Sequence, residues 1–291
     1  MNPINTTNHL LGAHFSIAKG FHDAVYQASS YGCNALQMFT KNATTWKERT
    51  VTRTEQERFE QAKTDTSIQS IATHTSYLIN LASPDPKKHA MSYDALKQEL
   101  IRSSALKIPF CVLHPGAHMD NGIDTGLLRI SKTINHLFSE TEEATPRLLL
   151  ETTAGQGTGL GHTFEQLADI SDKIEQKERI GICLDTCHIF AAGYDIRTQE
   201  TYARTMDHFE SVLGLDRLFV IHINDSKKGL GSRVDRHTHI GKGALGVDAF
   251  RHILNDERLF HAPKLLETAH TEGEIDWTQR NLDLLRSLGP D

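Results

Sequence analysis

Residues 180–188 join an apolar run to a carboxylate and an imidazole that stand three positions apart. The first half, Ile-Gly-Ile-Cys-Leu, has the composition of a short buried strand, and we expect a loop beyond it to carry Asp185 and His188. Oxygen and imidazole ligands both suit divalent cations, so these side chains can reach two neighbouring metal ions. One Asp-x-x-His pair often arises by chance, and the interpretation therefore depends on the elements around it.

Strand-like apolar runs alternate with helix-like amphipathic segments along the chain. We predict strands at residues 11–16, 34–39, 67–74, 110–115, 147–152, 180–186, 218–224 and 263–268. The predicted helices that follow them are residues 18–30, 54–64, 86–106, 125–142, 163–176, 198–213, 247–255 and 276–288. Parallel strands need such crossovers, so the pattern predicts an α/β fold, a single-domain (β/α)8 TIM barrel over residues 1–291. A doubly wound open sheet is the alternative, and it would place a ligand at one reversal of strand order.

Seven of the eight predicted strands end in a side chain that can bind a metal ion or transfer a proton. In chain order these are His14, His74, His114, Glu151, Asp185 (with His188 beyond it), His222 and Glu267. The carboxyl ends of barrel strands converge on one face, which is where TIM-barrel sites lie. Because burying such groups unpaired is costly, we expect metal ions to hold them together.

The long loop at residues 231–243 adds further candidate ligands. Asp235 and His237 alternate on an extended segment and therefore point the same way. With His188 they would form a three-ligand site of the open catalytic type. His239 continues the alternation and is either a competing ligand or a group behind the ligands. The glycine-rich residues 155–161 have the wrong spacing for a dinucleotide loop, and we expect a flexible loop that approaches a phosphate or a sugar.

The composition, with 38% hydrophobic and 23% charged residues, is that of a soluble globular protein. No run is apolar enough to cross a bilayer and the polar N-terminus has no secretory signal, so we expect a cytoplasmic protein whose residues 1–9 form a flexible extension. The four cysteines are expected to be buried reduced thiols, and a zinc site at Cys183 and Cys187 is a poor rival because a second cysteine pair is missing. The 17 histidines favour a metal site, and the charge of −6 argues against a nucleic-acid partner unless bound cations invert the local field.

Three segments resemble the signature motifs of the endonuclease IV family, the family 2 apurinic/apyrimidinic endonucleases. They are residues 74–81 (HTSYLINL), residues 183–195 (CLDTCHIFAAGYD), and residues 222–226 (HINDS) together with 231–243. The resemblance runs from Leu11 to the end of the last predicted helix. It implies a TIM barrel that holds three zinc ions and cuts DNA.

The resemblance also implies which residues bind each zinc ion. The first ion would take His74, His114 and Glu151. The second would take Glu151 as a bridge, with Asp185, His222 and Glu267. The third would take His188, Asp235 and His237. Four carboxylates and five neutral imidazoles contribute about −4 against +6 from three Zn²⁺, so a phosphodiester can bind there. A metal-bridging hydroxide would attack the phosphate, and Glu151 and Glu267 would help to hold and deprotonate the water.

The activity that the resemblance implies is cleavage of duplex DNA 5′ to abasic sites, leaving a 3′-hydroxyl and a 5′-deoxyribose phosphate. This is a step of base excision repair, and we expect a monomer that also trims 3′-blocked ends. Tyr77 and Leu78 match the positions at which the family wedges side chains into the helix, and His14 is left without a metal ion, either as a substrate-side group or as a group behind the ligands. Thr44 stands where the family commonly has an arginine. Candidate phosphate contacts are Lys41, Lys227, Arg233, Arg236 and Lys242.

Two other functions fit parts of the pattern. A sugar isomerase or epimerase shares the barrel and needs one Glu/Asp/His/Glu site, which would leave His188, Asp235 and His237 unexplained. A non-catalytic barrel that binds damaged DNA or stores metal is the second, and a complete open site argues against it. The number of metal ions per chain separates the isomerase from the nuclease, because one or two ions favour the former and three the latter.

Overall fold

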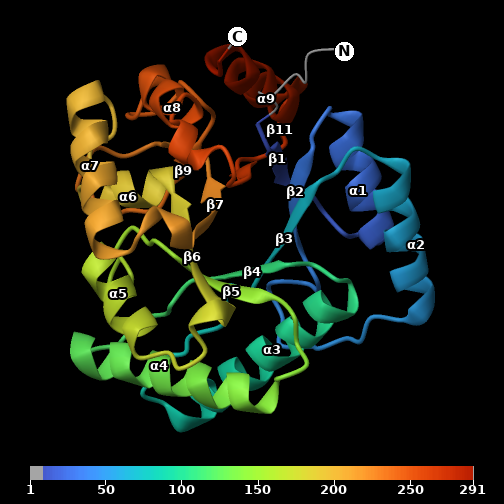
Figure 1. Ribbon diagram of the computed structural model, residues 1–291, viewed down its shortest axis with the longest axis vertical. Coiled ribbons are helices and arrows are strands. Elements are labelled where there is room, and N and C mark those ends of the chain that lie inside the picture. Colours follow the sequence, from blue (N-terminus) through green and yellow to red (C-terminus); the bar gives the residue numbers. More distant parts are fainter. Residues whose placement is uncertain (1–8, 291) are drawn as a thin grey trace.

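Eight parallel strands close into a barrel in the computed structural model, which describes residues 9–290 (Figure 1). The strands are β1 (Leu11–His14), β2 (Ala35–Phe39), β3 (Ser70–His74), β4 (Phe110–Leu113), β5 (Arg147–Glu151), β6 (Ile180–Asp185), β7 (Leu218–His222) and β10 (Lys264–Leu266). They are hydrogen-bonded in the order β1-β10-β7-β6-β5-β4-β3-β2, which returns to β1. The closed barrel confirms the predicted TIM barrel and rules out the open doubly wound sheet.

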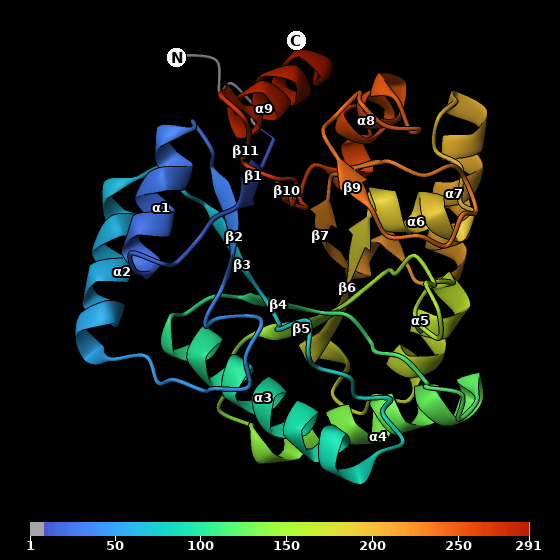
Figure 2. The ribbon, with the colours of Figure 1, turned by 180° about the vertical axis from the view of Figure 1, so that it is seen from behind.

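A ring of helices surrounds the barrel, as both axial views show (Figures 1 and 2). The helices are α1 (Phe21–Ser30), α2 (Arg53–Asp65), α3 (Pro86–Ala105), α4 (Ile123–Glu140), α5 (Phe164–Asp172), α6 (Thr186–Ala192), α7 (Gln199–Val212), α8 (Val247–Leu254) and α9 (Trp277–Leu288). Short 3₁₀ turns, η1 (Lys177–Arg179), η2 (Leu215–Arg217) and η3 (Glu257–Leu259), precede β6, β7 and β10. All eight predicted helices are present. None of the described helices has the length and apolarity that a membrane crossing requires.

The helix α6 was not predicted, because we expected a loop after the sixth strand. The helix begins where Asp185 caps it, with Oδ1 accepting a hydrogen bond from the backbone N–H of His188 at 2.8 Å. It ends at Gly193, whose φ of 117° lies in the region that residues with a Cβ avoid. A seven-residue helix is too short for hydrophobic periodicity to distinguish it from a loop. Asp185 therefore sits on a strand end and His188 on the first turn of a helix.

Two small antiparallel ribbons, also not predicted, lie outside the barrel sheet. β8 (Asp225–Ser226) pairs with β9 (His237–Thr238), and β11 (Thr271–Glu272) pairs with β12 (Ile275–Asp276). The first ribbon fastens the loop that carries His237 to the end of β7. Of the predicted extension at residues 1–9, residues 1–8 lie outside the described part of the chain, and the ring of His9 packs edge-on against Phe260 at 4.9 Å.

Alternation along the strands stacks two rings of side chains inside the barrel. The ring nearer the amino ends of the strands is apolar and consists of Ala35, Ala72, Val112, Leu149, Cys183, Val220 and Leu265. Two residues further along each chain segment, the side chains that point the same way are Gln37, His74, His114, Glu151, Asp185, His222 and Glu267. β1 contributes Gly12 and His14 at the corresponding positions, and a Cβ on Gly12 would lie 1.8 Å from the carbonyl oxygen of Ala35. The polar ring thus rests on a dry apolar floor.

Candidate metal centre

The nine predicted ligand residues meet at the carboxyl end of the barrel. His74, Glu151, Asp185 and His222 are the last residues of their strands, and His114 and Glu267 directly follow β4 and β10. His188 reaches the same place from α6, Asp235 from the loop between β8 and β9, and His237 from the start of β9. We call these nine residues the ligand cluster. Their donor atoms gather in four overlapping sets, which are His74, His114 and Glu151; Glu151, Asp185, His222 and Glu267; Asp185, His188 and His237; and Asp235 and His237 with Cys187. We describe the last two sets together as the third group.

The first group consists of His74, His114 and Glu151. Oε2 of Glu151 lies 3.1 Å from Nε2 of His74 and 2.9 Å from Nε2 of His114. The other ring nitrogen of His74, Nδ1, lies 2.8 Å from the carbonyl oxygen of Thr75, which can only accept a hydrogen bond. A neutral His74 therefore keeps its proton on Nδ1 and presents the lone pair of Nε2 to the group.

The second group combines Glu151 with Asp185, His222 and Glu267. Nδ1 of His222 lies 2.9 Å from Oε1 of Glu151, 3.1 Å from Oε2 of Glu267 and 3.9 Å from Oδ2 of Asp185. The two carboxylate oxygens of Glu151 thus face two different groups. This is the arrangement that a bridging carboxylate requires.

The third group forms around His188 and His237, whose Nε2 atoms are 3.4 Å apart. Asp235 approaches both, with Oδ2 at 3.1 Å from His188 Nε2 and Oδ1 at 3.4 Å from His237 Nε2. Oδ2 of Asp185 also lies 3.5 Å from His237 Nε2, so that Asp185 stands between the second and third groups. The thiol of Cys187 lies within reach of Asp235 and His237, a neighbour that we did not predict.

The donor set fits divalent cations. Nδ1 of His188 lies 2.8 Å from the carbonyl oxygen of Thr152, so a neutral His188 directs a lone pair at His237 and Asp235. Lone pairs that face one another at these distances repel unless a cation or a proton stands between them. Oxygen and imidazole nitrogen are the ligands that Zn²⁺ accepts in tetrahedral and open sites.

The charges of the ligand cluster also shift the pKa values of its own side chains. Burial by itself would lower the pKa of His188, but the carboxylates of Asp185 and Asp235 raise it well above its usual range. Burial would raise the pKa of Glu151, yet the imidazoles of His114 and His222 hold it well below its usual range. The carboxylates of the ligand cluster therefore stay ionised and attract positive charge, whether a proton or a metal ion carries it.

Gln37 is the eighth member of the polar ring and was missed in the sequence. Its Nε2 donates to Oε1 of Glu267 at 2.6 Å, and its Oε1 lies 2.8 Å from Nε2 of His222. The amide oxygen can only accept, so it fixes the proton of a neutral His222 on Nε2 and leaves Nδ1 for the second group. The signal was available, because Gln37 follows Ala35 by two residues on a strand whose alternation is clear.

Asn224 is another functional neighbour that we did not assign. Its Nδ2 donates to Oδ2 of Asp185 at 2.7 Å, and its Oδ1 accepts from the backbone N–H of Glu267 at 2.8 Å. The residue is fully buried, so both contacts are shielded from water. Its place in the HINDS motif was the only available sign of this role.

His14 lies beside the ligand cluster. Its Nδ1 is 3.2 Å from Nε2 of Gln37, and its ring packs on Phe39 with centroids 4.4 Å apart. Burial lowers the pKa of His14 to about 3, although Glu267 partly opposes this shift. A neutral imidazole between the ring and the loops suits the substrate-side role that we expected for it.

The predicted DNA contacts differ in exposure. Tyr77 is 70% exposed and stands over Phe39, with ring centroids 5.4 Å apart, whereas Leu78 is half-buried. Tyr77 is therefore a rim residue and not part of the packing under a helix. Of the candidate phosphate contacts, Lys227, Arg233, Arg236 and Lys242 are exposed.

Lys41 does not lie where a phosphate contact should. It is buried, its Nζ donates to the carbonyl oxygen of Thr45 at 2.5 Å, and it pairs with Glu48 at 3.2 Å. Glu48 also pairs with the buried Arg102 of α3. The ammonium of Lys41 is therefore committed to holding the loop after β2. Thr44 on the same loop is exposed, and its hydroxyl donates to Oδ1 of Asn42 at 2.8 Å.

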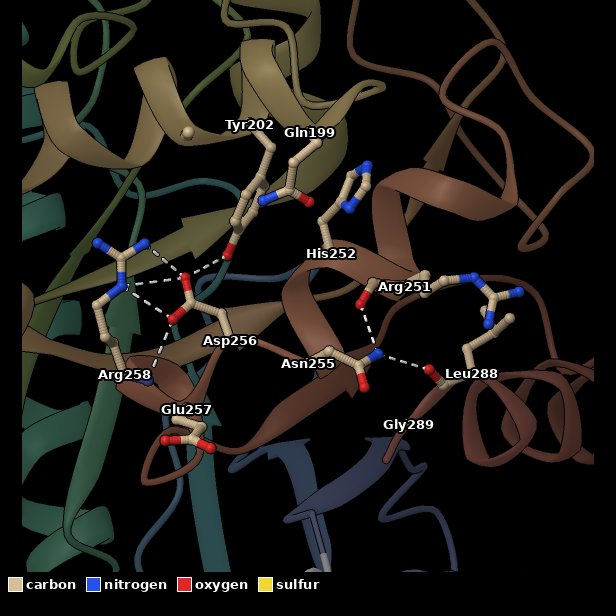
Figure 3. A pocket seen from close by; sticks show the side chains of 11 residues that line it. Gln199, Tyr202, Arg251, His252, Asn255, Asp256, Glu257, Arg258, Leu288 and Gly289 are labelled. Carbon is tan, nitrogen blue, oxygen red and sulfur yellow. Dashed lines mark hydrogen bonds and ion pairs between the residues drawn. The ribbon is translucent and has the colours of Figure 1, made fainter. Parts of the chain in front are cut away.

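Two pockets show where a ligand can enter. One, of about 310 Å³, opens beside the ligand cluster and is lined in part by Tyr77, Gln156 and Asp235. Another, of about 570 Å³, lies among α7, α8, η3 and the end of α9 (Figure 3). There Asp256 accepts hydrogen bonds from both Tyr202, at 2.8 Å, and Arg258, at 2.7 Å. These groups satisfy one another, whereas the first pocket adjoins the ligand cluster and includes His114 and His188 in its lining.

The four cysteines are free and buried, as expected. Cys183 belongs to the apolar ring inside the barrel and Cys187 lies on α6 beside the third group. The fold therefore does not form a zinc site from this pair of cysteines alone. The glycine-rich loop at residues 155–161 also has a local role, because Gln156 Oε1 accepts from the backbone N–H of Asp235 at 3.1 Å.

The barrel with a metal-binding rim belongs to a known class. Residues 25–288 match the family model described as xylose isomerase-like TIM barrel, and the chain belongs to that class of protein. A Citrifermentans bemidjiense relative named "Probable endonuclease 4" is 46% identical over 280 residues, which cover 96% of this chain and 98% of the relative. The crystal structure of endonuclease IV from Thermus thermophilus has 33% identity and a TM-score of 0.85, covering 96% of this chain and 98% of that one. The chain belongs to the endonuclease IV family and is an enzyme of that family.

Other members of the class share only the fold. A D-tagatose 3-epimerase-like protein superimposes with a TM-score of 0.71 at 16% identity, covering 95% of this chain and 96% of that one. At this level of identity the likeness concerns the barrel and not the reaction.

Proposed function

We propose that the protein is a zinc-dependent DNA repair endonuclease. It hydrolyses the phosphodiester bond 5′ to an abasic site, leaves a 3′-hydroxyl and a 5′-deoxyribose phosphate, and so takes part in base excision repair. It acts as a monomer on duplex DNA and also removes groups that block 3′ ends. Three zinc ions bound by the ligand cluster supply the metal chemistry.

The observation that carries this proposal is the third group of ligands. A barrel isomerase needs one Glu/Asp/His/Glu site, and the second group alone would satisfy it. His188, Asp235 and His237 lie within 3.1–3.4 Å of one another at their donor atoms, next to that site. A phosphodiester has several oxygens that need charge neutralisation during cleavage, which gives an extended cation cluster a purpose.

Zinc ions held there would lower the pKa of a shared water and stabilise charge on the phosphate and the leaving oxygen. Side chains of the protein, Glu151 and Glu267, would orient the attacking water and help to deprotonate it. Glu151 is fully buried between the first two groups, whereas the Glu267 side chain keeps 17% exposure. Oε1 of Glu267 accepts from Gln37 and Oε2 faces Nδ1 of His222 at 3.1 Å, so Oε2 is the oxygen that would help to hold a zinc ion and its water and, as the water ionises, would help to take up the proton.

Exposed side chains around the rim would bind and sense the DNA. Lys227, Arg233, Arg236 and Lys242 are free to contact phosphates, which sets the register of a duplex without reading its sequence. Tyr77 presents an aromatic ring to the substrate side, where it can stack into the gap left by a missing base. Thr44 is too short to fill such a gap, so Tyr77 carries more of this task here than it would beside an arginine.

The test is cleavage of an end-labelled duplex that contains one abasic site, by protein of known zinc content. We expect one nick on the 5′ side, a product that a DNA polymerase extends, and three zinc ions per chain by elemental analysis. An undamaged duplex of the same sequence is the control. Full activity after complete removal of metal would overturn the proposal.

The same measurements address the other two functions. One or two metal ions per chain, with conversion of a ketose and no DNA cleavage, would favour a sugar isomerase or epimerase that uses the second group. Tight binding of the abasic duplex by zinc-loaded protein without any nick would favour a non-catalytic DNA-binding barrel.

A further inference from the structure

Asn281 of α9 connects two ligand-bearing segments that lie far apart in the sequence. The residue is 1% exposed and makes three side-chain contacts. Its Oδ1 accepts from the backbone N–H of Ile240 at 3.1 Å, and its Nδ2 lies 3.1 Å from Oγ1 of Thr268 and 3.2 Å from Nδ1 of His239. Ile240 and His239 follow the ligand His237, and Thr268 follows the ligand Glu267.

At its tip, the loop held by Asn281 is bonded to the end of α6, because the backbone N–H groups of Gly231 and Arg233 donate to the carbonyl oxygens of Phe190 and Ala191 at 3.1 and 2.9 Å. Residues 229–233 are exposed, and Arg233 has a φ of 52°. On the near side, the loop is attached through the β8–β9 ribbon and through the contact between Gln156 and Asp235. On the far side, the buried residues His239 and Ile240 are both bonded to Asn281, and the backbone N–H groups of residues 243–245 donate to Asp225 and Ser226.

His239 reinforces this attachment. Its ring stacks on the indole of Trp277, with centroids 4.1 Å apart and planes at 4°. Since Nδ2 of Asn281 is a donor, it leaves the His239 proton on Nε2, which lies 3.4 Å from the carboxylate of Glu272. The position that we considered as a competing ligand is therefore built into the wall of the site, between α9 and the β11–β12 ribbon.

We propose that Asn281 is a positioning residue, which sets the distance between the third group of ligands and Glu267. It acts through His239, Ile240 and Thr268. Metal sites lose affinity and rate when the residues behind their ligands are removed, typically by about 10- to 100-fold. This inference rests on the proposed zinc function for its effect on catalysis, but its effect on the loop is independent of metal.

The test compares Asn281→Leu with Asn34→Leu. Asn34 is a matched control, because it is also buried but lies at the opposite end of the barrel. Its Oδ1 accepts from the backbone N–H of Leu11 at 2.7 Å, and its Nδ2 donates to the carbonyl oxygen of His9 at 2.9 Å. In metal-free protein, we expect faster amide hydrogen exchange at residues 235–240 in N281L than in wild type or N34L. In zinc-loaded protein, we expect one zinc ion to be lost to a competing chelator about 10-fold more readily and kcat to fall with little change in KM.

Unchanged exchange at residues 235–240 in N281L, or losses of zinc and kcat no larger than those of N34L, would overturn the inference. If N281L does not fold, Thr268→Val removes one arm of the contact at nearly constant shape and must shift zinc retention in the same direction, or the inference is wrong. If wild-type protein neither binds zinc nor nicks an abasic duplex, the proposed function is wrong. The hydrogen-exchange result then tests the role of Asn281 by itself.

Discussion

At the scale of single residues, Glu151 is the side chain on which two ligand groups depend. Each of its oxygens faces imidazole nitrogen, Oε2 that of His74 and His114 and Oε1 that of His222. A neutral amide in its place would keep the shape and lose the charge. It would also turn an NH2 group towards lone pairs that now face a carboxylate oxygen.

We therefore expect Glu151→Gln to lower kcat on an abasic duplex by about 100-fold or more and to release at least one zinc ion. Steady-state kinetics and elemental analysis of the purified variant measure both quantities. Glu165→Gln changes an exposed glutamate on α5 and serves as the control, which should match wild type. Near-normal activity of E151Q with all its metal would show that Glu151 is not a bridge.

Protons and metal ions should compete for the ligand cluster. The pKa of His188 is raised in the metal-free protein, so its protonated form stabilises the fold below the usual pKa of about 6.5, and this stabilisation is lost as the pH rises through the raised value. We expect the melting temperature of metal-free protein to fall as the pH rises above about 6.5, whereas the increase in melting temperature on adding zinc should grow over the same range. Scanning calorimetry at several pH values checks both trends, and a zinc effect that shrinks as the pH rises would contradict them.

At the scale of elements, the βα repeat positions the ligands, and α6 is the element that departs from the expected pattern. Its N-terminus is capped by Asp185, so one carboxylate has two tasks: Oδ1 holds the first turn and Oδ2 faces the cluster. The helix is short, and its end depends on Gly193. A change in α6 therefore moves His188 directly.

A side chain at Gly193 should lower the free energy of unfolding, although there is room for one. A Cβ there meets no atom within 4 Å, so the cost of Gly193→Ala comes from its φ of 117° alone. We expect a loss of about 1–2 kcal/mol in the free energy of unfolding. Urea denaturation measures it, with Gly229→Ala as the control, because Gly229 also has open space around it and its φ lies outside the left-handed range. Equal effects of the two substitutions would refute the argument.

At the scale of the whole molecule, the two ends of the barrel have different tasks. The ligand cluster occupies the carboxyl end, and the opposite end contributes stability. Lys264 begins β10 at that opposite end, is fully buried, and donates through Nζ to the carbonyl oxygen of Leu259 at 2.5 Å. Burial lowers the pKa of this lysine from 10.5 to about 8.

Replacing Lys264 should therefore stabilise the protein without affecting catalysis. The unfolded chain binds this proton more tightly than the folded one, so the contribution of Lys264 to stability is least favourable below about pH 8 and recovers as the pH rises towards 10.5. We expect Lys264→Met to raise the free energy of unfolding at pH 7 by up to about 3 kcal/mol, with a gain that vanishes near pH 10.5. Denaturation at both pH values tests this, with kcat measured alongside. A variant that is less stable than wild type at pH 7 would contradict it.

The amino-acid sequence by itself determined the barrel and the composition of its rim. Periods of two and 3.6 residues marked eight strands and eight helices, and strand ends carried side chains of metal-binding type. Convergence of parallel strand ends then brought six of the nine ligands to one face, because the fold leaves them no other place. His188, Asp235 and His237 were predicted as a three-ligand site from their spacing and alternation, the resemblance of the motifs implied the same set, and the folded chain brings them to the same face.

Only the tertiary structure decided the contacts behind those ligands. Gln37 and Asn281 are amides, which are not typical metal ligands, and although alternation places Gln37 on the inner face of its strand, the partners of both residues lie far away in sequence. Lys41 looked like a surface cation until the loop after β2 turned it inwards to Glu48. Local periodicity reports which face of an element is buried, but it carries no information on which distant side chain meets it there. That choice is made when the barrel closes.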